Sequence, residues 1–374
     1  MRKEAHVHDV IVVGAGASGA LAAALLAKAE HDVLLLDANR FPVRATCTDW
    51  LSPHAEDILK SAAVPTEGIL GDPVRHCSMY LADFSKSIDP ELPERTAFLV
   101  DYGQLTQVIV RQFQAGRQGR FEDQTEVVEI RLGEDKITAL LADGRQYLGK
   151  FLLLATGVDS RLVQQTGLSA GLAEGDGWWA SAYSCPSGAL AAPGRMDCVL
   201  AVGGAGGVGH RMSRDGRLTV GVCVEGSASD AQRELESLSD RFMQRGLLPS
   251  DWAEHARGVT PSRSAAGVAL AMDSHVAKRT LLIGHVGGFA ASYTNEGIYP
   301  GMWSAALASQ VLIEALQSSV PQDTLRRFES LWRTELAGHL RAPFTDSQSI
   351  LPLVFSNKQM AGKMVEAFHL GVNF

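Results

Sequence analysis

Asp9-Val-Ile-Val-Val-Gly-Ala-Gly-Ala-Ser-Gly19, continued by Ala20-Leu-Ala-Ala-Ala-Leu-Leu-Ala27, is an apolar strand, a glycine turn and a helix start in direct succession. In this pattern the first glycine makes a tight turn and the second lets the backbone approach a pyrophosphate. The third lets the helix pack close to the strand. The free N–H groups at the start of the helix then face the phosphates. The stretch predicts a dinucleotide site, with a glycine turn in an ordinary α/β unit as the alternative.

The next strand strengthens this prediction. Val33-Leu-Leu-Leu-Asp37 is apolar and ends in an acid, about 20 residues after the glycine turn, where a carboxylate accepts hydrogen bonds from ribose hydroxyls. We expect the nucleotide to contact residues of the first turn and of the end of this strand. They are Gly14, Gly16, Ala17, Ser18, Gly19, Asp37 and Ala38.

The composition is that of an ordinary globular protein. With 374 residues and 46% apolar side chains, the chain can bury a large core, and its length suggests two or three lobes. The formal charge of −8 and the lack of a lysine or arginine run argue against a nucleic-acid partner. No apolar stretch is long enough to cross a bilayer, so we expect no transmembrane segment.

The cysteines and histidines give no sign of a disulfide framework or a metal site. The five cysteines are odd in number, widely spaced and without a C-x-x-C pair, which is typical of reduced thiols in a cytoplasmic protein. His6 and His8 share one face of the first strand but lack further ligands in the sequence, so we expect no metal there.

The first half of the chain alternates between predicted helices and predicted strands. Ser52-Pro53 predicts a helix start, and the spacing over 102–113 predicts an amphipathic helix. Alternating segments between 126 and 148, broken by a turn at Asp143-Gly144, predict a small antiparallel sheet. The apolar run 151–157 then predicts a strand buried on both faces of a central sheet.

The second half of the chain begins with a change in sequence pattern. Residues 166–264 are rich in strand-like runs and predict a separate sheet, with one helix over 230–245. Residues 280–288 predict a further buried strand with a glycine turn, and residues 297–316 predict a helix. From about Pro321 onward the pattern is helical.

Three distant pieces together carry a family resemblance. They are the first glycine turn with Asp37, the segment Leu154-Ala-Thr-Gly-Val-Asp-Ser-Arg161, and the segment from Ile283-Gly-His-Val-Gly-Gly-Phe289 to Asn295-Glu-Gly-Ile298. They resemble the FAD-binding signatures of the p-hydroxybenzoate hydroxylase and geranylgeranyl reductase superfamily. The loop Phe41-Pro-Val-Arg-Ala-Thr-Cys47 further resembles the reductase branch, in which an Arg contacts the flavin nucleotide and a Cys lies near the isoalloxazine.

The resemblance implies an α/β fold with a Rossmann-like FAD-binding domain, a second antiparallel β-sheet substrate domain and a C-terminal helical segment. The expected FAD-binding domain is discontinuous, at residues 1–75, 98–165 and 265–318; the substrate domain takes 76–97 and 166–264, and the helical region 319–374. Cys47 is the catalytic candidate. The further candidates for contact with FAD are Arg44, Thr156, Gly157, Gly284, His285, Gly288, Glu296, Gly297 and Ile298.

Two departures from the family pattern affect the expected chemistry. Thr156-Gly157 stands where the family usually has Asp-Gly, so direct use of NAD(P)H is not assured. Gly284-His285 stands where the family has Gly-Asp, and a neutral imidazole can replace one hydrogen bond to the ribityl chain because it both donates and accepts. The aromatic lipid-substrate motif of the reductase branch is also not matched.

Several other features have two interpretations. The glycine-rich stretch 203–209 is a hairpin or pocket-lining loop, or else a second phosphate loop. Trp178-Trp179 packs in the lobe or walls a substrate pocket. The stripe Met360, Met364 and Phe368 packs inside or forms a lid or membrane-surface contact, and Cys47 is a flavin-facing group or an inert thiol.

The sequence therefore predicts an FAD-dependent oxidoreductase. We expect a small, largely apolar organic substrate, transformed by flavin hydride transfer or by flavin-mediated monooxygenation, with NAD(P)H or a separate reductase as electron donor. The alternative is a flavin-binding protein whose altered motif positions mark a degenerate, non-catalytic site.

Overall fold

The apolar run that opens the chain forms a central strand, β1 (Val7–Val13), of an eight-stranded sheet. The computed structural model describes residues 6–42, 50–169, 171, 177–186, 192–204, 206–214, 216–342 and 347–371. The strand order is β17-β18-β10-β1-β2-β7, and the strands from β18 to β7 are parallel. The other strands are β2 (Val33–Leu36), β7 (Gly119–Glu122), β8 (Val127–Leu132), β9 (Ile137–Leu141), β10 (Gln146–Leu154), β17 (Val276–Ala277) and β18 (Thr280–Leu282).

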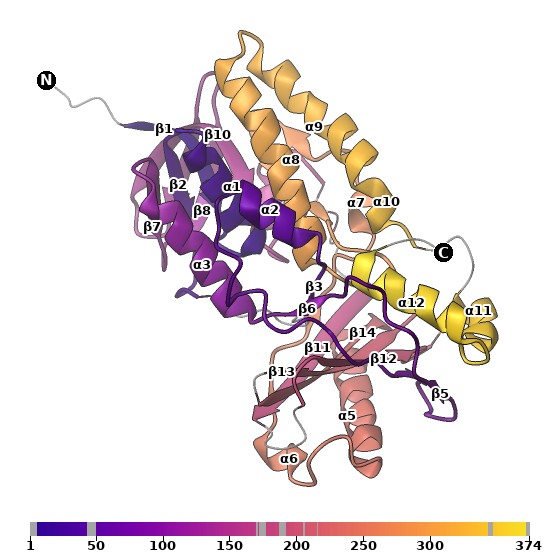
Figure 1. Ribbon diagram of the computed structural model, residues 1–374. Coiled ribbons are helices and arrows are strands. Elements are labelled where there is room, and N and C mark those ends of the chain that lie inside the picture. The colour runs from indigo at the N-terminus through magenta and orange to yellow at the C-terminus, as the bar shows by residue number, and fades with distance from the viewer. Residues whose placement is uncertain are drawn as a thin grey trace, which may run out of the picture.

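The alternation of side chains along β1 divides the core of this sheet into two layers. Val10 and Val12 pack toward a layer of helices, which is shown in front of the sheet in Figure 1. Ile11 and Val13 face the other side, where β8, β9 and the short helix α4 (Arg161–Gln164) cover the sheet. The helices of the first layer are α1 (Ala17–Lys28), α3 (Tyr102–Ala115), α8 (Ile298–Gln317) and α9 (Pro321–Glu335), with α2 (Ala55–Ser61) against α8.

The long strand β10 corrects one expectation. The sequence predicted a small antiparallel sheet before a separate buried strand, but β10 runs unbroken from Gln146 to Leu154. Its first half pairs antiparallel with β9, and its second half lies parallel to β1 and β18. The predicted hairpin is therefore an extension of the central sheet. Helix α2 also begins later than predicted, at Ala55 with His54 as its N-cap.

A second eight-stranded sheet has the order β15-β11-β14-β13-β12-β4-β5, with β16 beside β11. All its neighbouring strands are antiparallel except β12 and β4. Helix α5 (Ala228–Gln244) covers one face, below the sheet in Figure 1, and α11 (Ser347–Val354) and α12 (Lys358–Leu370) cover the other. The strands are β4 (Met79–Leu81), β5 (Ser87–Ile88), β11 (Gly177–Pro186), β12 (Arg195–Leu200), β13 (Val208–Arg214), β14 (Arg217–Gly226), β15 (Arg257–Gly258) and β16 (Ser262–Arg263).

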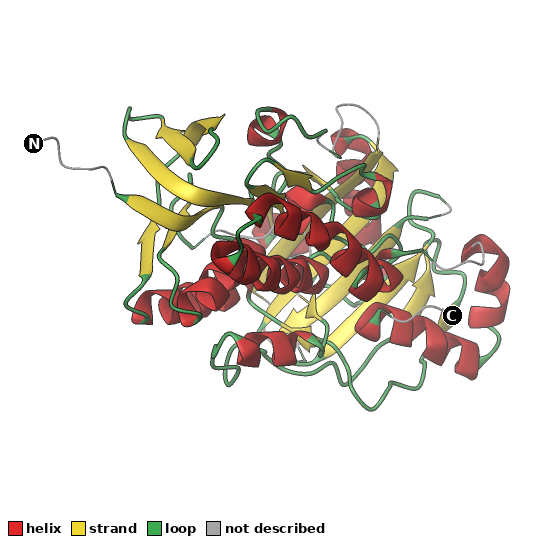
Figure 2. Cartoon of the chain, turned by 90° about the horizontal axis from the view of Figure 1, so that it is seen from above, coloured by secondary structure: helices red, strands yellow, loops and turns green. Residues whose placement is uncertain are grey.

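The remaining elements connect these layers. A two-stranded ladder lies between the two large sheets, and the amino end of the first sheet and the C-terminal helices lie at opposite ends of the molecule (Figure 2). None of the helices in the described ranges has the length and hydropathy that a bilayer crossing requires. The remaining elements are β3 (Trp50–Leu51), β6 (Phe98–Leu99), α6 (Trp252–His255), α7 (Val268–Ala271), α10 (Ala337–Leu340) and a 3₁₀ turn, η1 (Gly284–Gly287).

The predicted fold class is confirmed by this arrangement, including the helical C-terminal segment. Two ambiguous features take their packing interpretation. β12 and β13 pair antiparallel and follow each other in the chain, and the described glycines between them, Gly203, Gly204, Gly206 and Gly207, lie in their connection. Met364 and Phe368 are buried between α12 and the second sheet, because that face of the sheet is apolar.

His369 on α12 makes stability depend on pH. It is fully buried, and neither ring nitrogen has a hydrogen-bond partner among the described residues. Burial lowers the pKa of His369 from 6.5 to about 4. In this window the unfolded chain takes up a proton that the folded chain does not, so stability is lost as the pH falls from 6.5 toward 4.

Replacing His369 by leucine should therefore flatten the acid branch of the stability profile. The expected result is a smaller drop in the thermal midpoint between about pH 7 and about pH 5 than in the wild type. His255→Leu, at an exposed histidine, is the matched control and should leave the profile unchanged. An equal drop in the wild type and in His369→Leu would contradict the assignment.

Candidate functional site

A cavity of about 510 Å³ lies at the carboxyl ends of β1 and β10, where the three predicted glycine turns meet. This is the edge of a parallel sheet at which α/β proteins bind nucleotides. Most of the predicted cofactor residues line it. They are Gly14, Gly16, Ala17, Ser18, Asp37, Ala38, Thr156, Gly157, Gly284, His285, Gly297 and Ile298.

The glycines of the first turn have different roles. Gly14 has φ +106°, and a Cβ there would lie 2.2 Å from the Ala155 carbonyl oxygen. At Gly19 a Cβ would lie 1.9 Å from the Gly14 carbonyl oxygen, so this glycine lets α1 pack against the turn. At Gly16 a Cβ would approach only the Tyr102 hydroxyl, at 2.8 Å. Gly16 is thus the glycine that keeps the cavity open.

The amino end of α1 faces the cavity without a side-chain cap. The Ala17 N–H donates to the Tyr102 hydroxyl oxygen at 3.0 Å. Tyr102 is the first residue of α3, next to the capping residue Asp101. The sequence predicted this helix but missed Tyr102 as a site residue, because local spacing does not say which helix lies beside α1.

Asp37 directly follows β2 at the other side of the cavity and is buried. Its Oδ2 accepts from the Ala15 N–H at 2.7 Å, and its Oδ1 accepts from the Asn39 N–H at 2.8 Å. A carboxylate has about four acceptor positions, so it can accept further hydrogen bonds. The backbone contacts fix the carboxylate at the mouth of the turn.

Asp37→Ala should weaken FAD binding by about 1.5–3 kcal/mol, the range for a hydrogen bond to a charged group. The dissociation constant can be measured by flavin fluorescence titration of the apoprotein. Asp143→Ala, at an exposed acid on a distant turn, serves as the control. An unchanged dissociation constant in the Asp37 variant would rule out its contact with the ribose.

Ser18 joins the first and third turns. A Cβ at Gly284 would lie 2.7 Å from the Ser18 hydroxyl oxygen, and a Cβ at Gly301 would lie 2.6 Å from it. The start of α1, the turn η1 and the first turn of α8 therefore pack around one small side chain. As a result, the N-termini of α1 and of the 20-residue helix α8 face the same cavity.

His285 lies beside the start of α8. A Cβ at Gly297 would lie 2.2 Å from its ring Cε1, so the ring rests against the Gly297 backbone. Burial lowers the pKa of His285 below its ordinary value, which favours the neutral imidazole. Gly297, the N-cap of α8, has no side-chain cap of its own. This end of the cavity thus has a helix terminus and a neutral ring where the family pattern has an acid.

The cavity also reaches the second sheet. Ser262 and Arg263 on β16 line it, and the Arg263 guanidinium lies 5.6 Å from the centroid of the Trp179 ring. The sequence assigned this segment to the substrate domain and did not predict that it lines the site. Other lining residues that the sequence missed are Asn39, Glu126, Val127, Val128, Val158, Asp159, Arg161, Leu162 and Gln165.

Three predicted residues do not line the cavity. Gly19 lies beneath the first turn, and a Cβ at Gly288 would lie 2.3 Å from the Ala269 nitrogen, so both are sites of close packing. The Glu296 carboxylate accepts from the Ser52 N–H at 3.0 Å and pairs with His339 at 3.3 Å. The remaining two predicted residues, Arg44 and Cys47, lie outside the described residues.

The residues present fit an adenine dinucleotide. The cavity has an acid at one end, the N-terminus of α1 with its glycine cradle in the middle, and a second helix terminus at the other end. Helix N-termini stabilise phosphate and other negative charge. This donor set therefore suits a dinucleotide cofactor.

Comparisons with known proteins agree with this assignment. Residues 8–215 match the family model described as pyridine nucleotide-disulphide oxidoreductase. The chain is 36% identical over 85 residues to a menaquinone reductase of Mycobacterium tuberculosis, which is 23% of this chain and 20% of that protein. It is 23% identical over 354 residues to digeranylgeranylglycerophospholipid reductase 2 of Methanococcoides burtonii, covering 88% of this chain and 80% of the relative.

Solved structures show the same fold. A geranylgeranyl bacteriochlorophyll reductase-like protein from Thermoplasma acidophilum superposes with a TM-score of 0.72 at 17% identity, covering 98% of this chain and 93% of that chain. PqsL, a probable FAD-dependent monooxygenase from Pseudomonas aeruginosa, superposes with a TM-score of 0.66 at 16% identity, covering 96% and 99%. The predicted superfamily resemblance is confirmed. Since the family model spans more than half of the chain and includes its first two glycine turns, the protein belongs to the pyridine nucleotide-disulphide oxidoreductase family and is an FAD-binding oxidoreductase.

Proposed function

We propose that this protein uses FAD to reduce a small, largely apolar, unsaturated organic substrate bound between its two sheets. The observation that carries the proposal is one continuous cavity that runs from Asp37 past the N-termini of α1 and α8 to Arg263 on the second sheet. When bound there, FAD would supply two-electron hydride chemistry. The protein would supply the orientation and the electrostatics.

The first turn and Asp37 would hold the nucleotide half of the cofactor. The N–H groups of α1 would face the pyrophosphate, and Thr156-Gly157 and Gly284-His285 would flank the chain between phosphate and ring. The uncapped start of α8 would stabilise negative charge on the reduced ring. Cys47 stays a prediction for a position near the isoalloxazine.

Asn295, two residues before the N-cap of α8, is our candidate for holding the substrate. It has a left-handed backbone, with φ 58°, and its Oδ1 accepts from Cys223 Sγ at 3.0 Å and from Ser264 Oγ at 2.9 Å. Its buried Nδ2 has no hydrogen-bond partner among the described residues. A buried donor without a partner is costly, so an oxygen of the substrate is a fitting acceptor.

The surroundings of Asn295 favour an apolar substrate. Cys223 belongs to a buried cluster on the inner face of the second sheet, together with Trp50 and Leu200. The Trp50 indole N–H is likewise buried without a partner among the described residues. These residues are buried beside the start of α8 and do not line the cavity itself, so they would suit an apolar molecule with one or two acceptor oxygens only where the substrate reaches past the cavity.

Reduction is favoured over monooxygenation by the relatives. The menaquinone reductase and the digeranylgeranylglycerophospholipid reductase are both named as reductases, and the second matches most of the chain. Flavin-mediated monooxygenation is the second candidate, since PqsL shares the fold. A flavin protein without turnover is the third. These alternatives differ in what they consume, so kinetics can separate them.

The electron donor is either NAD(P)H or a separate reductase. A second cavity, of about 890 Å³, shares Tyr102 with the first and is lined by Arg214, Arg217 and Arg257. These arginines support direct binding of a phosphorylated donor, because guanidinium groups bind phosphate in a bidentate manner. Asp101 lies among them and pairs with Arg214, which lowers the net positive charge of this cavity.

The decisive experiment follows NAD(P)H consumption and product formation with a panel of quinones and other unsaturated apolar compounds, with and without oxygen. A reductase consumes donor and substrate in equal amounts without oxygen. A monooxygenase requires oxygen and incorporates one of its atoms. Absence of turnover with NAD(P)H and with dithionite-reduced protein would leave the non-catalytic alternative.

His285 should set the reduction potential of the bound flavin. His285→Asp is expected to retain FAD but to lower the potential by on the order of 30 mV or more, because a negative charge disfavours the reduced, anionic form. His285→Asn, of the same size without the charge, is the matched control. The potential can be measured by equilibration with reference dyes. A potential that stays constant or rises in the Asp variant would contradict the placement of His285 beside the flavin.

The proposal includes a division into domains. The FAD-binding domain takes residues 1–75, 98–165 and 265–318, the substrate domain 76–97 and 166–264, and the helical region 319–374. The order of strands in the two sheets supports this division. A cytoplasmic location is supported by the four described cysteines, Cys77, Cys185, Cys198 and Cys223, which are buried free thiols.

A further inference from the structure

We propose that His6, His8 and Asp32 form a binding site for a divalent transition-metal ion of the Zn²⁺ type. The sequence predicted no metal here because the two histidines lacked further ligands. The fold supplies the third ligand, since Asp32 directly precedes β2 and lies beside the amino end of β1. One ligand atom from each residue lies within 4.8 Å of the other two.

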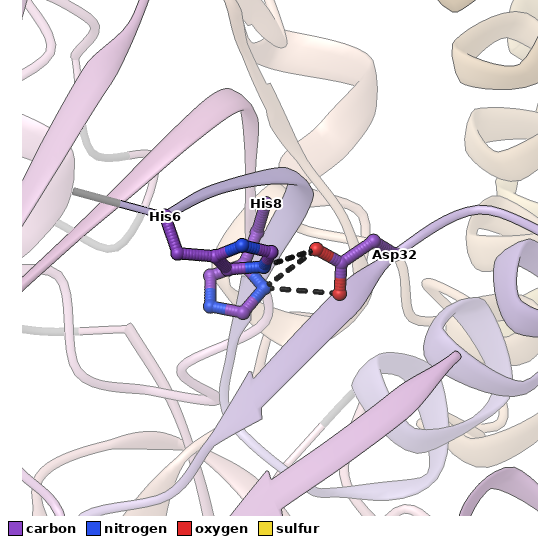
Figure 3. Close-up of side chains that lie close together, drawn as sticks. All are labelled: His6, His8 and Asp32. Carbon is purple, nitrogen blue, oxygen red and sulfur yellow. Dashed lines mark hydrogen bonds and ion pairs between the residues drawn. The ribbon is translucent and has the colours of Figure 1, made fainter. Parts of the chain in front are cut away.

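The ring nitrogens of the two histidines and the carboxylate oxygens of Asp32 lie close together. His6 Nε2 lies 2.6 Å from Asp32 Oδ2, and His8 Nδ1 lies 3.1 Å from Asp32 Oδ1. The centroids of the His6 and His8 rings are 4.5 Å apart, and the rings lie edge to face. Figure 3 shows both rings turned toward the carboxylate from the same side. Imidazole nitrogen and carboxylate oxygen are the ligands that Zn²⁺ takes at about 2.0–2.2 Å. Binding would replace the direct hydrogen bond between His6 and Asp32 and would require the His6 ring, which is exposed, to rotate outward.

The backbone of Asp32 is held in place by β1. Its carbonyl oxygen accepts from the N–H groups of Asp9 and Val10, at 2.9 and 3.2 Å. Its own N–H donates to Asp9 Oδ2 at 3.0 Å. A ligand whose main chain is fixed loses little freedom when it binds a metal, so the site is preorganised on this side.

The other charged side chains near the site pair with Asp9 and not with Asp32, so the Asp32 carboxylate is available to a metal ion. The neighbouring cation, Lys150, pairs with Asp9 Oδ1 at 2.7 Å, and His31 lies 3.7 Å from Asp9 Oδ2. Among the described residues, the ion pairs of Asp32 involve only His6 and His8. With both imidazoles neutral, the cluster presents one negative charge and two nitrogen donors, which suits a divalent cation with water at its remaining positions.

The site is separate from the flavin cavity. Its ligands lie at the amino ends of β1 and β2, whereas Gly14 and Asp37 lie at the carboxyl ends. β1 has seven residues, which places the two sites roughly 20 Å apart. A metal at this position would clamp the first strand to the loop between α1 and β2. Its role is therefore structural.

The test uses the full-length, untagged protein, treated with a chelator and dialysed. We expect calorimetric titration with ZnCl₂ to saturate at one equivalent per chain, and the thermal midpoint to rise with Zn²⁺. His6→Ala, at an exposed side chain, and Asp32→Asn, which keeps the size of the residue, should each weaken binding by about tenfold or more. His255→Ala removes an exposed histidine that lies near a single acid, Asp251, and should leave the affinity unchanged.

The outcomes separate a built site from surface binding. No stoichiometric uptake by the wild type would overturn the proposal. So would equal affinities in the wild type, His6→Ala and Asp32→Asn, because weak binding at scattered histidines does not depend on these residues. Loss of affinity in both variants, with unchanged FAD content, would support it.

Discussion

Gly16→Val is expected to abolish FAD binding while leaving the protein folded. The backbone at Gly16 has φ −66° and ψ 178°, which any residue adopts, so the substitution causes no backbone strain. Its added atoms would project into the cavity at the N-terminus of α1, where the neighbouring atom is the end of the Tyr102 side chain. The expected loss of affinity is on the order of 100-fold or more, because the pyrophosphate needs this close approach.

The measurement is the flavin content of the purified protein, together with a titration of the apoprotein. Circular dichroism and the thermal midpoint of the apoprotein should match those of wild-type apoprotein. Gly338→Ala is the control, since nothing lies within 4 Å of a Cβ there. A Gly16→Val protein that binds FAD normally would show that the phosphates lie elsewhere.

Asp197→Ala should be the most destabilising single substitution proposed for this protein. Asp197 on β12 is fully buried and lies opposite Arg211 on β13. Its carboxylate lies 2.7 Å from Arg211 Nη1 and 2.9 Å from Arg195 Nη2, and it also accepts from the Ser78 N–H at 3.2 Å. Removing the acid leaves a buried guanidinium without its counter-charge, which costs about 3–5 kcal/mol.

Urea unfolding followed by tryptophan fluorescence would measure this loss. The matched control is Asp143→Ala, because Asp143 pairs with Arg145 at 2.7 Å on the surface. That variant should lose no more than about 1 kcal/mol. Similar losses in both variants would mean that the buried pair contributes no more than an exposed one.

The predictions that succeeded rest on patterns of short range. The strand, turn and helix around Gly14 occur in the predicted order, as does the helix α5, which was predicted over 230–245 and observed over Ala228–Gln244. Apolar periodicity and turn residues report on local backbone structure, which is the same wherever the element is placed. The resemblance then linked three distant turns, and all three line one cavity.

The features that the sequence did not predict concern neighbours in space. β10 pairs with β9 along its first half and lies between β1 and β18 along its second half. No local sequence pattern distinguishes one such long strand from two separate strands. Tyr102 and Arg263 line the cavity because α3 and β16 happen to pack there. Glu296 lies in the predicted loop before α8, but its carboxylate contacts Ser52 and His339 and does not line the cavity.

The sequence by itself determined most of the local elements and the glycine turns, because helices, strands and tight turns follow from periodicity and from the conformations that glycine alone allows. The fold class followed from the family resemblance that these turns carry. Only the tertiary structure decided which side chains meet. Strand pairing brought Asp32 to His6 and His8, and helix packing brought Ser18 between Gly284 and Gly301. Such contacts depend on register and packing between segments far apart in the chain, which are set by burial of the whole core.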